Sequence, residues 1–180
     1  VPQIAGANFG ITSDGFFSLT QQPRKVLIVG AGYIATEFAG VLNALGSDVT
    51  MLLRKDTLLR NFDILLQEKV MEAMSKNGIK IISNKYVKTL NSGSQDQLYA
   101  DCDDVSYGPF DTVIWAVGRH PAISDLKLET AGIATDVDGH VIVDPYQNTN
   151  IRNVYAVGDV TGHHNLTPVA IATGRRLADR

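Results

Sequence analysis

Cysteine, basic clusters and long hydrophobic runs are scarce in this sequence. Cys102 is the one cysteine among 180 residues, which excludes an internal disulfide, a four-cysteine zinc site and a dithiol redox centre made within the chain. The 16 Lys+Arg against 19 Asp+Glu give a formal charge of −3 with no basic run, so we expect no nucleic-acid partner and no anionic membrane face. No apolar stretch reaches the roughly 20 residues of a membrane-spanning helix, and the first residues do not resemble a signal peptide.

The sequence does contain enough apolar material for a core. Hydrophobic residues make up 44% of it, so we expect one folded domain, or one domain and part of another. Three apolar runs are typical of buried strands, and two segments between them have the helical period. The strands are expected at 25–29, 48–53 and 79–82, and the helices at 33–45, with Ile34, Phe38, Val41, Leu42 and Leu45 inward, and from Asn61 or Asp63 to 76. This order predicts an α/β fold with a central parallel sheet and helices on both faces.

The pattern changes after the third strand. Short strands are expected at 85–90 and 97–102, on either side of a polar turn at 91–94, and a last strongly apolar strand at 111–117. A small antiparallel β-meander inserted before the last strand of the parallel sheet fits this order.

A dinucleotide fingerprint follows the first strand and opens the first helix. In Gly30-Ala31-Gly32-Tyr33-Ile34-Ala35, Gly30 permits the tight turn, Gly32 lets the backbone approach a pyrophosphate, and Ala35 keeps helix and strand close. The helix N-terminus offers unpaired N–H groups to the phosphates. Because the motif lies in the required strand–turn–helix context, it favours a dinucleotide site over an ordinary glycine turn.

The end of the second strand indicates which dinucleotide binds. NAD sites usually carry an acid there for the ribose 2′-hydroxyl, but this strand has Leu53 at that position. Arg54 and Arg60 flank the following turn, and Lys55 lies beside Arg54. Guanidinium groups suit a 2′-phosphate, which a carboxylate at position 53 would repel. We therefore predict NADP(H) rather than NAD(H).

A second nucleotide signature lies near the C-terminus. Val154–Asp159 is expected as an apolar strand ending in Gly158-Asp159, where a glycine leaves room for a ligand and a carboxylate accepts hydrogen bonds from sugar hydroxyls. Thr167, as cap, and Pro168 then open a C-terminal helix. Its positive end suits an electron-rich ring that gains negative charge on reduction.

Taken together, the motifs resemble the glutathione reductases, a branch of the FAD-dependent pyridine nucleotide–disulfide oxidoreductases. The resemblance runs through the whole chain in order. The segments that carry it are Gly30–Glu37, Arg54 with Arg60–Asp63, Ile114–Arg119, Tyr146–Thr149, Ala156–Asp159 and Leu166–Ala170. It implies a Rossmann-like FAD/NAD(P)-binding fold and an enzyme that passes a hydride from NADPH to FAD, and then electrons through an active-site disulfide to glutathione disulfide.

The resemblance also implies roles for individual residues. Glu37 would lie near the nicotinamide carboxamide, Tyr33 would cover the flavin until the nicotinamide displaces it, and Arg54 and Arg60 would read the 2′-phosphate. The cofactor-binding set expected for NADPH is Gly30, Ala31, Gly32, Tyr33, Ile34, Ala35, Glu37, Arg54, Lys55, Arg60, Gly118 and Arg119, and the set for FAD is Asp159 and Thr167.

Other parts of such an enzyme are not in this sequence, namely the glycine-rich turn for the FAD adenosine diphosphate, the Cys-x4-Cys pair, and the dimer domain with its catalytic His and Glu. We therefore expect a connecting segment from the FAD domain at 1–22, the NADP(H)-binding domain at 23–144, and an incomplete piece of the FAD-binding domain at 145–180. The chain is expected to bind NADPH without turnover and to have no catalytic residue. Its partners would be the rest of the reductase and, in the full-length homodimer, glutathione disulfide. The enzyme is expected to be cytoplasmic.

The remaining reactive side chains are assigned no chemistry. Cys102 is expected in a polar loop, Asp101–Asp104, whose carboxylates raise the pKa of the thiol and make it a poor redox nucleophile. Neither a metal site there nor a catalytic role for His163 and His164 is expected.

Three alternatives stay open at this stage. The chain could be a redox-silent NADPH-binding module, although such a module has no reason to keep a flavin half-site. It could come from a trypanothione or mercuric reductase, which share much of this region. An origin in an NAD-linked lipoamide dehydrogenase is disfavoured, because those relatives carry Glu near position 53.

Overall fold

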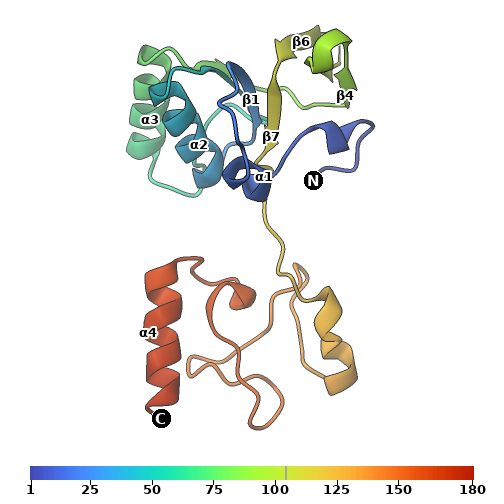
Figure 1. The fold of residues 1–180 in the computed structure, drawn as a ribbon. Coiled ribbons are helices and arrows are strands. Elements are labelled where there is room, and N and C mark those ends of the chain that lie inside the picture. Colours follow the sequence, from blue (N-terminus) through green and yellow to red (C-terminus); the bar gives the residue numbers. More distant parts are fainter. Residues whose placement is uncertain (104) are drawn as a thin grey trace. The chain divides into compact units, whose positions relative to one another are not determined.

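The computed structural model describes residues 1–103 and 105–180 and divides them into two compact units. The units are Val1–Gly118 and Arg119–Arg180 (Figure 1). The expected end of the NADP(H)-binding domain at 144 therefore differs from the border between the compact units, and the functional assignment of 119–144 stays a prediction.

A four-stranded parallel sheet forms the centre of the first unit. Its strands are β1 (Lys25–Val29), β2 (Asp48–Leu52), β3 (Lys80–Ile82) and β7 (Thr112–Trp115), in the order β3-β2-β1-β7. All three pairings are parallel. In β1 and β2 every residue after the first is buried, as expected for strands covered on both faces. The predicted α/β class and parallel sheet are confirmed.

Three helices pack on one face of this sheet. They are α1 (Ser13–Phe17), α2 (Tyr33–Ala44) and α3 (Ile64–Lys76), and their apolar side chains join Val26 and Ile28 of β1 in one core cluster. The rings of Phe16 and Phe38 stack with centroids 3.9 Å apart, which fixes α1 against α2.

The inward face of α2 differs in part from the prediction. Phe38 and Leu42 are buried as expected, but Val41 and Leu45 are 48% and 62% exposed. Ala35 and Ala39 are fully buried instead. Because these small side chains face the sheet, the helix lies close to it, and Val41 and Leu45 lie toward the side of the helix that is open to solvent.

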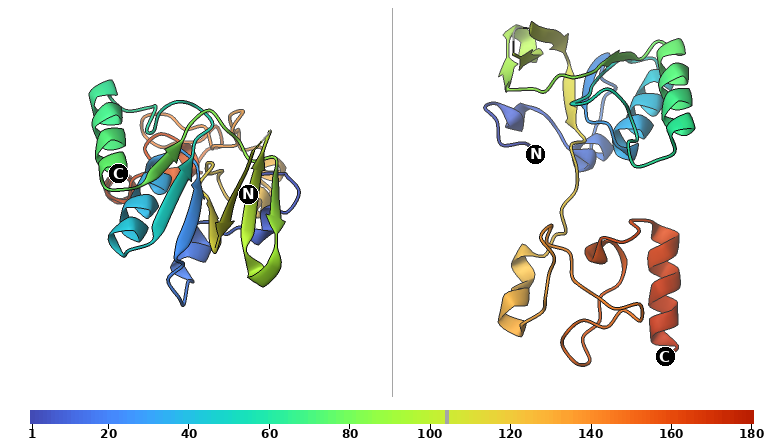
Figure 2. Two further views of the ribbon diagram at one scale, coloured as in Figure 1. Left: turned by 90° about the horizontal axis from the view of Figure 1, so that it is seen from above. Right: turned by 180° about the vertical axis from the view of Figure 1, so that it is seen from behind.

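The opposite face of the sheet is covered mainly by a three-stranded antiparallel meander rather than by α-helices (Figure 2). Its strands are β4 (Thr89–Ser92), β5 (Leu98–Cys102) and β6 (Val105–Phe110). The meander was predicted, but the expectation of helices on both faces was wrong for the described residues. In β5 alternate residues, namely Leu98, Ala100 and Cys102, are buried. These apolar side chains cover the second face of the sheet, so no second layer of α-helices is needed there.

Three details of the predicted meander were wrong as well. Residues 85–88 are not part of a strand, while Asn91 and Ser92, predicted as turn, belong to β4. The strand β6 was missed because it contains Gly108 and Pro109, residue types that usually indicate a turn.

The N-terminal segment packs on the first unit. Ala7, in the short 3-10 helix η1 (Ala7–Phe9), is buried, and its carbonyl accepts a 2.8 Å hydrogen bond from the Trp115 indole N–H. The Ile11 N–H donates to the Val113 carbonyl oxygen at 2.8 Å. The residues expected as a connecting segment therefore have contacts within the described chain.

The second unit contains one α-helix, α4 (Thr167–Ala178), and the 3-10 helices η3 (Ser124–Leu126), η4 (Leu128–Ala131) and η5 (Gly158–Thr161) in its described residues. The prediction of a strand at Val154–Asp159 is wrong. Tyr155 forms only an isolated β-bridge with Asn148, and a strand needs several consecutive residues paired in this way. The predicted C-terminal helix is confirmed, but Leu166 is its N-cap and Thr167 is already helical.

No helix in residues 1–103 or 105–180 combines the length and apolar character needed to cross a membrane.

Candidate functional site

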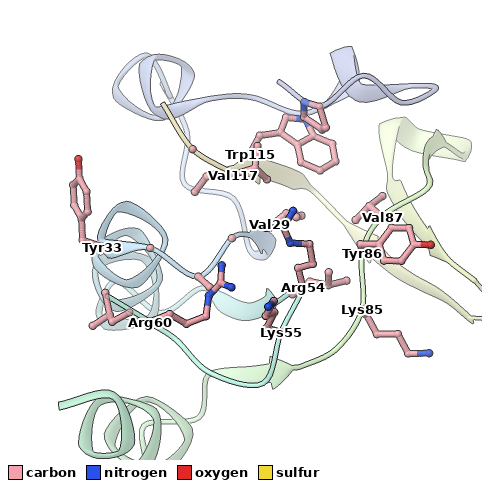
Figure 3. Close-up of a pocket in the computed structure, with 18 of the residues that line it drawn as sticks. Val29, Tyr33, Arg54, Lys55, Arg60, Lys85, Tyr86, Val87, Trp115 and Val117 are labelled. Atoms are coloured by element: carbon pink, nitrogen blue, oxygen red, sulfur yellow. The ribbon is translucent and has the colours of Figure 1, made fainter. Parts of the chain in front are cut away.

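A cavity of about 500 Å³ opens at the carboxyl ends of β1, β2 and β7 (Figure 3). In open α/β sheets this edge is where ligands bind. All the lining residues belong to the first unit. They are Pro2, Val29–Tyr33, Leu52, Arg54, Lys55, Leu59–Phe62, Lys85–Val87 and Trp115–Gly118.

The glycine turn forms the wall between β1 and α2. Gly30 has φ +148°, and a Cβ at this position would lie 2.2 Å from the Ala116 carbonyl oxygen, so only glycine fits. Gly32 is the N-cap of α2, and a Cβ there would meet no atom within 4 Å. The helix begins with no acidic residue in its first turn. Its free N–H groups and positive dipole end therefore suit a pyrophosphate that approaches over Gly32.

Basic side chains line the cavity beyond β2. We call Leu53–Phe62 the basic turn, because it carries Arg54, Lys55 and Arg60, all exposed. Within residues 1–103 and 105–180, no carboxylate pairs with these three cations, and the lining contains no Asp or Glu. Leu53 is fully buried. The turn therefore presents three cations to the cavity, whereas its carboxylate, the exposed Asp56, does not line the cavity.

The basic turn is attached to the glycine turn by main-chain hydrogen bonding. The Leu59 N–H donates to the Ala31 carbonyl oxygen at 2.7 Å, and Leu59 has φ +52°. Both Leu58 and Leu59 are buried in the core. This arrangement places Arg60 beside the glycine turn, and Figure 3 shows Arg54, Lys55 and Arg60 directed toward the middle of the site.

The wall on the other side was missed by the sequence prediction. Lys85, Tyr86 and Val87 line it together with the indole of Trp115. The Lys85 N–H donates to the Leu53 carbonyl oxygen at 3.0 Å, which holds this segment beside the basic turn. Their position in the sequence could have predicted this wall. Lys85–Val87 follow β3, and the carboxyl ends of all parallel strands lie at one edge of the sheet.

Comparison with known proteins agrees with this geometry. The model of the pyridine nucleotide–disulphide oxidoreductase family matches residues 1–174. The chain belongs to this family. A glutathione reductase from Schizosaccharomyces pombe is 48% identical over 181 aligned residues, which cover 98% of this chain and 38% of that protein.

The chain is also similar to solved structures of flavoprotein disulfide reductases, at lower sequence identity. The copper(II) complex of RclA, an HOCl-induced flavoprotein disulfide reductase from Escherichia coli, superposes with a TM-score of 0.92 and 31% identity, over 99% of this chain and 42% of its own. A second structure of RclA from Escherichia coli gives a TM-score of 0.90 and 30% identity, over 97% of this chain and 40% of its own. This chain thus spans about two fifths of the length of these relatives.

Eight of the expected NADPH contacts line the cavity. They are Gly30, Ala31, Gly32, Tyr33, Arg54, Lys55, Arg60 and Gly118. Four do not: Ala35 is fully buried in the core, Ile34 packs against it, Glu37 is exposed on the next turn of α2, and Arg119 belongs to the second unit. The sequence pattern could not separate residues that shape the turn from residues that face the cavity.

The two expected FAD contacts lie in the second unit. Asp159 lies in η5 and Thr167 begins α4, and both are exposed. Gly158 has φ +79°, and a Cβ there would lie 3.3 Å from the Ala170 Cβ. The glycine therefore allows the turn that carries Asp159 to pack against α4.

Cys102 has a different environment from the one expected. It lies in β5, not in a loop, and is 1% exposed. Burial is the main reason that its thiol pKa is raised, and the neighbouring Asp103 and Asp101 add to the effect while Lys85 opposes it. Asp104 lies outside the described residues. A buried thiol with a raised pKa is a poor nucleophile.

The other candidates for metal or acid–base chemistry are not assembled into a site. His163 and His164 lie outside any helix or strand and are exposed. No group of three His, Cys, Asp or Glu side chains in the described part of the chain has the geometry to hold a metal ion.

Proposed function

We propose that this chain is the NADPH-binding part of a glutathione-disulfide reductase and that it presents NADPH for hydride transfer to FAD. The family membership and the 48% identity to a glutathione reductase support the enzyme class. The observation that carries the cofactor choice is the basic turn, with Arg54, Lys55 and Arg60 exposed and Leu53 at the end of β2.

The residues of the cavity fit the parts of NADPH. Gly32 leaves room for the pyrophosphate, which the N–H groups of α2 would hold. Arg54 and Arg60 would hold the 2′-phosphate through charge-assisted hydrogen bonds. When bound, NADPH supplies the hydride, and the chain's own residues orient it.

We further propose residue roles at the reacting end on the strength of the family resemblance. Tyr33 is 45% exposed at the start of α2, so its ring is free to shield a flavin and to move aside. Glu37, one helical turn later, would meet the carboxamide. In the second unit, Asp159 and the N-terminus of α4 at Thr167 would contact the FAD ribityl chain and pyrimidine ring.

The cofactor proposal is tested by thermal unfolding of the 180-residue chain with NADPH or NADH. A ligand at 100 times its dissociation constant stabilises the folded protein by about 2.7 kcal/mol. We expect NADPH to raise the unfolding midpoint at much lower concentration than NADH. Equal stabilisation by both would contradict the choice of NADPH.

The chain by itself should not turn over glutathione disulfide. Reduction in this family passes through a cysteine pair, whereas this sequence has one cysteine, which is buried. The assay is NADPH oxidation in the presence of glutathione disulfide and added FAD. We expect no rate above background, and sustained turnover would contradict this part of the proposal.

A further inference from the structure

Gln67 of α3 is hydrogen-bonded to the basic turn through its side-chain amide. Its Nε2 donates to the Phe62 carbonyl oxygen at 2.8 Å and makes a longer contact of 3.4 Å to the Arg60 carbonyl oxygen. Its Oε1 accepts a hydrogen bond from the Thr57 hydroxyl at 3.2 Å. One side chain thus connects three positions of the turn, one of which is the main chain of Arg60.

The basic turn is therefore held from two sides. The Leu59 N–H joins it to the Ala31 carbonyl oxygen of the glycine turn, and Gln67 joins it to α3. Arg60 lies between these two attachments. Its side chain is exposed, lines the cavity and has no carboxylate partner among the described residues, so the two attachments fix the main chain from which the guanidinium extends.

The helix does not depend on these contacts. Asp63 caps α3 independently, because its Oδ1 accepts a 2.9 Å hydrogen bond from the Leu65 N–H. Loss of the Gln67 amide should therefore loosen the turn and leave α3 and the glycine turn in place.

We infer that Gln67 is a positioning residue for cofactor selectivity, which holds the main chain at Arg60 so that the guanidinium faces the 2′-phosphate of NADPH. This inference rests on the proposed function. It predicts an effect on NADPH that NADH, which has no 2′-phosphate, does not share.

The test is the Gln67→Met variant of the 180-residue chain, which keeps the length of the side chain and its helix propensity but removes the hydrogen bonds. Dissociation constants for NADPH and NADH are measured by fluorescence titration. We expect the NADPH constant to rise about tenfold, the loss expected for one weakened charge-assisted contact, while the NADH constant changes less than about twofold. Gln21→Met, the same replacement at an exposed position that does not line the cavity, is the matched control and should change neither.

Thr57→Val is the second variant, because it removes one of the three contacts and leaves Gln67 in place. We expect a smaller loss of NADPH affinity in the same direction. Unchanged selectivity in both variants, or an equal loss of NADPH and NADH, would overturn the role of Gln67. If the unmodified chain did not distinguish NADPH from NADH, the proposed function itself would fail.

Discussion

At the scale of single residues, Gly30 and Gly32 have different physical requirements although they lie two positions apart. Gly30 has a positive φ and lies close to the Ala116 carbonyl oxygen, so the fold itself requires glycine at this position. Gly32 faces open space and has φ −86°, which any residue adopts. The fold therefore does not require glycine at position 32, and we propose that the approach of the cofactor pyrophosphate does.

This difference makes a prediction with two matched variants. Gly30→Ala should destabilise the chain by about 2–4 kcal/mol, because a Cβ clashes with backbone and the conformation is strained. Gly32→Ala should leave the free energy of unfolding nearly unchanged and weaken NADPH and NADH alike. Urea unfolding and cofactor titration measure the two effects. A Gly32→Ala chain that bound both cofactors normally would show that the pyrophosphate does not lie over the turn.

Arg54 and Arg60 are the residues expected to distinguish the two cofactors. Each charge-assisted hydrogen bond contributes roughly 1.5–3 kcal/mol, so the Arg54→Ala/Arg60→Ala chain should lose about a hundredfold or more in NADPH affinity. NADH affinity should change only a few-fold.

Arg24 provides the control for this prediction, since its exposed side chain does not line the cavity. Arg24→Ala should change neither constant. An equal loss of NADPH and NADH in the double variant would mean that the arginines contact the pyrophosphate or the adenosine instead of the 2′-phosphate.

At the scale of secondary-structure elements, periodicity predicted the parts of the fold that depend on local sequence. The strands β1 and β2 are continuous apolar runs, and α2 and α3 follow glycine and aspartate caps, so their positions could be derived. Periodicity alone did not predict the wall at Lys85–Val87 or the covering of the second face by the meander, because both depend on which segments the sheet brings together. The wall follows only from the further rule that the carboxyl ends of all parallel strands share one edge. The strand expected at Val154–Asp159 failed for a related reason, since an apolar run forms a strand only where a paired neighbour exists.

The turn at Asp144–Asn148 in the second unit is held by a network that should respond to acid. The pKa of Asp144 is lowered, first by hydrogen bonds from the side chain and N–H of Asn148, and further by the Tyr146 N–H and the charge of Arg180. Arg180 itself donates to the Tyr146 carbonyl oxygen at 3.1 Å and to Asn148 Oδ1 at 2.8 Å. The C-terminal residue is thereby tied to the turn.

The sign of the pH dependence follows from the lowered pKa. A carboxyl whose pKa is lower in the folded state stabilises the fold above its ordinary pKa of about 3.9, and this contribution is lost as the pH falls through the lowered value. Asp144→Asn should weaken the protection of the Tyr146 and Asn148 amide protons against hydrogen exchange at pH 7. In this variant the protection should also decrease less steeply below about pH 4 than in the unmodified chain. Hydrogen exchange measures this protection. An unchanged pH dependence would show that Asp144 does not hold the turn.

At the scale of the whole molecule, the described cavity lies entirely within the first unit, and the expected flavin contacts lie in the second. This division agrees with a chain that supplies the pyridine-nucleotide site of a larger flavoprotein. The relatives that it matches are more than twice its length, so electron transfer to a disulfide stays a proposal about the complete enzyme. The binding of NADPH is the step that this chain can be tested for directly.

The central claim is that the basic turn holds the 2′-phosphate of NADPH, and phosphorus NMR of the bound cofactor tests it most directly. A phosphate monoester loses its second proton with a pKa near 6, and two guanidinium groups favour the dianion. The 2′-phosphate resonance of NADPH bound to the unmodified chain should therefore titrate at a lower pH than that of free NADPH, and the Arg54→Ala/Arg60→Ala chain should abolish the difference at saturating cofactor. A bound 2′-phosphate that titrates like the free one would contradict the claim.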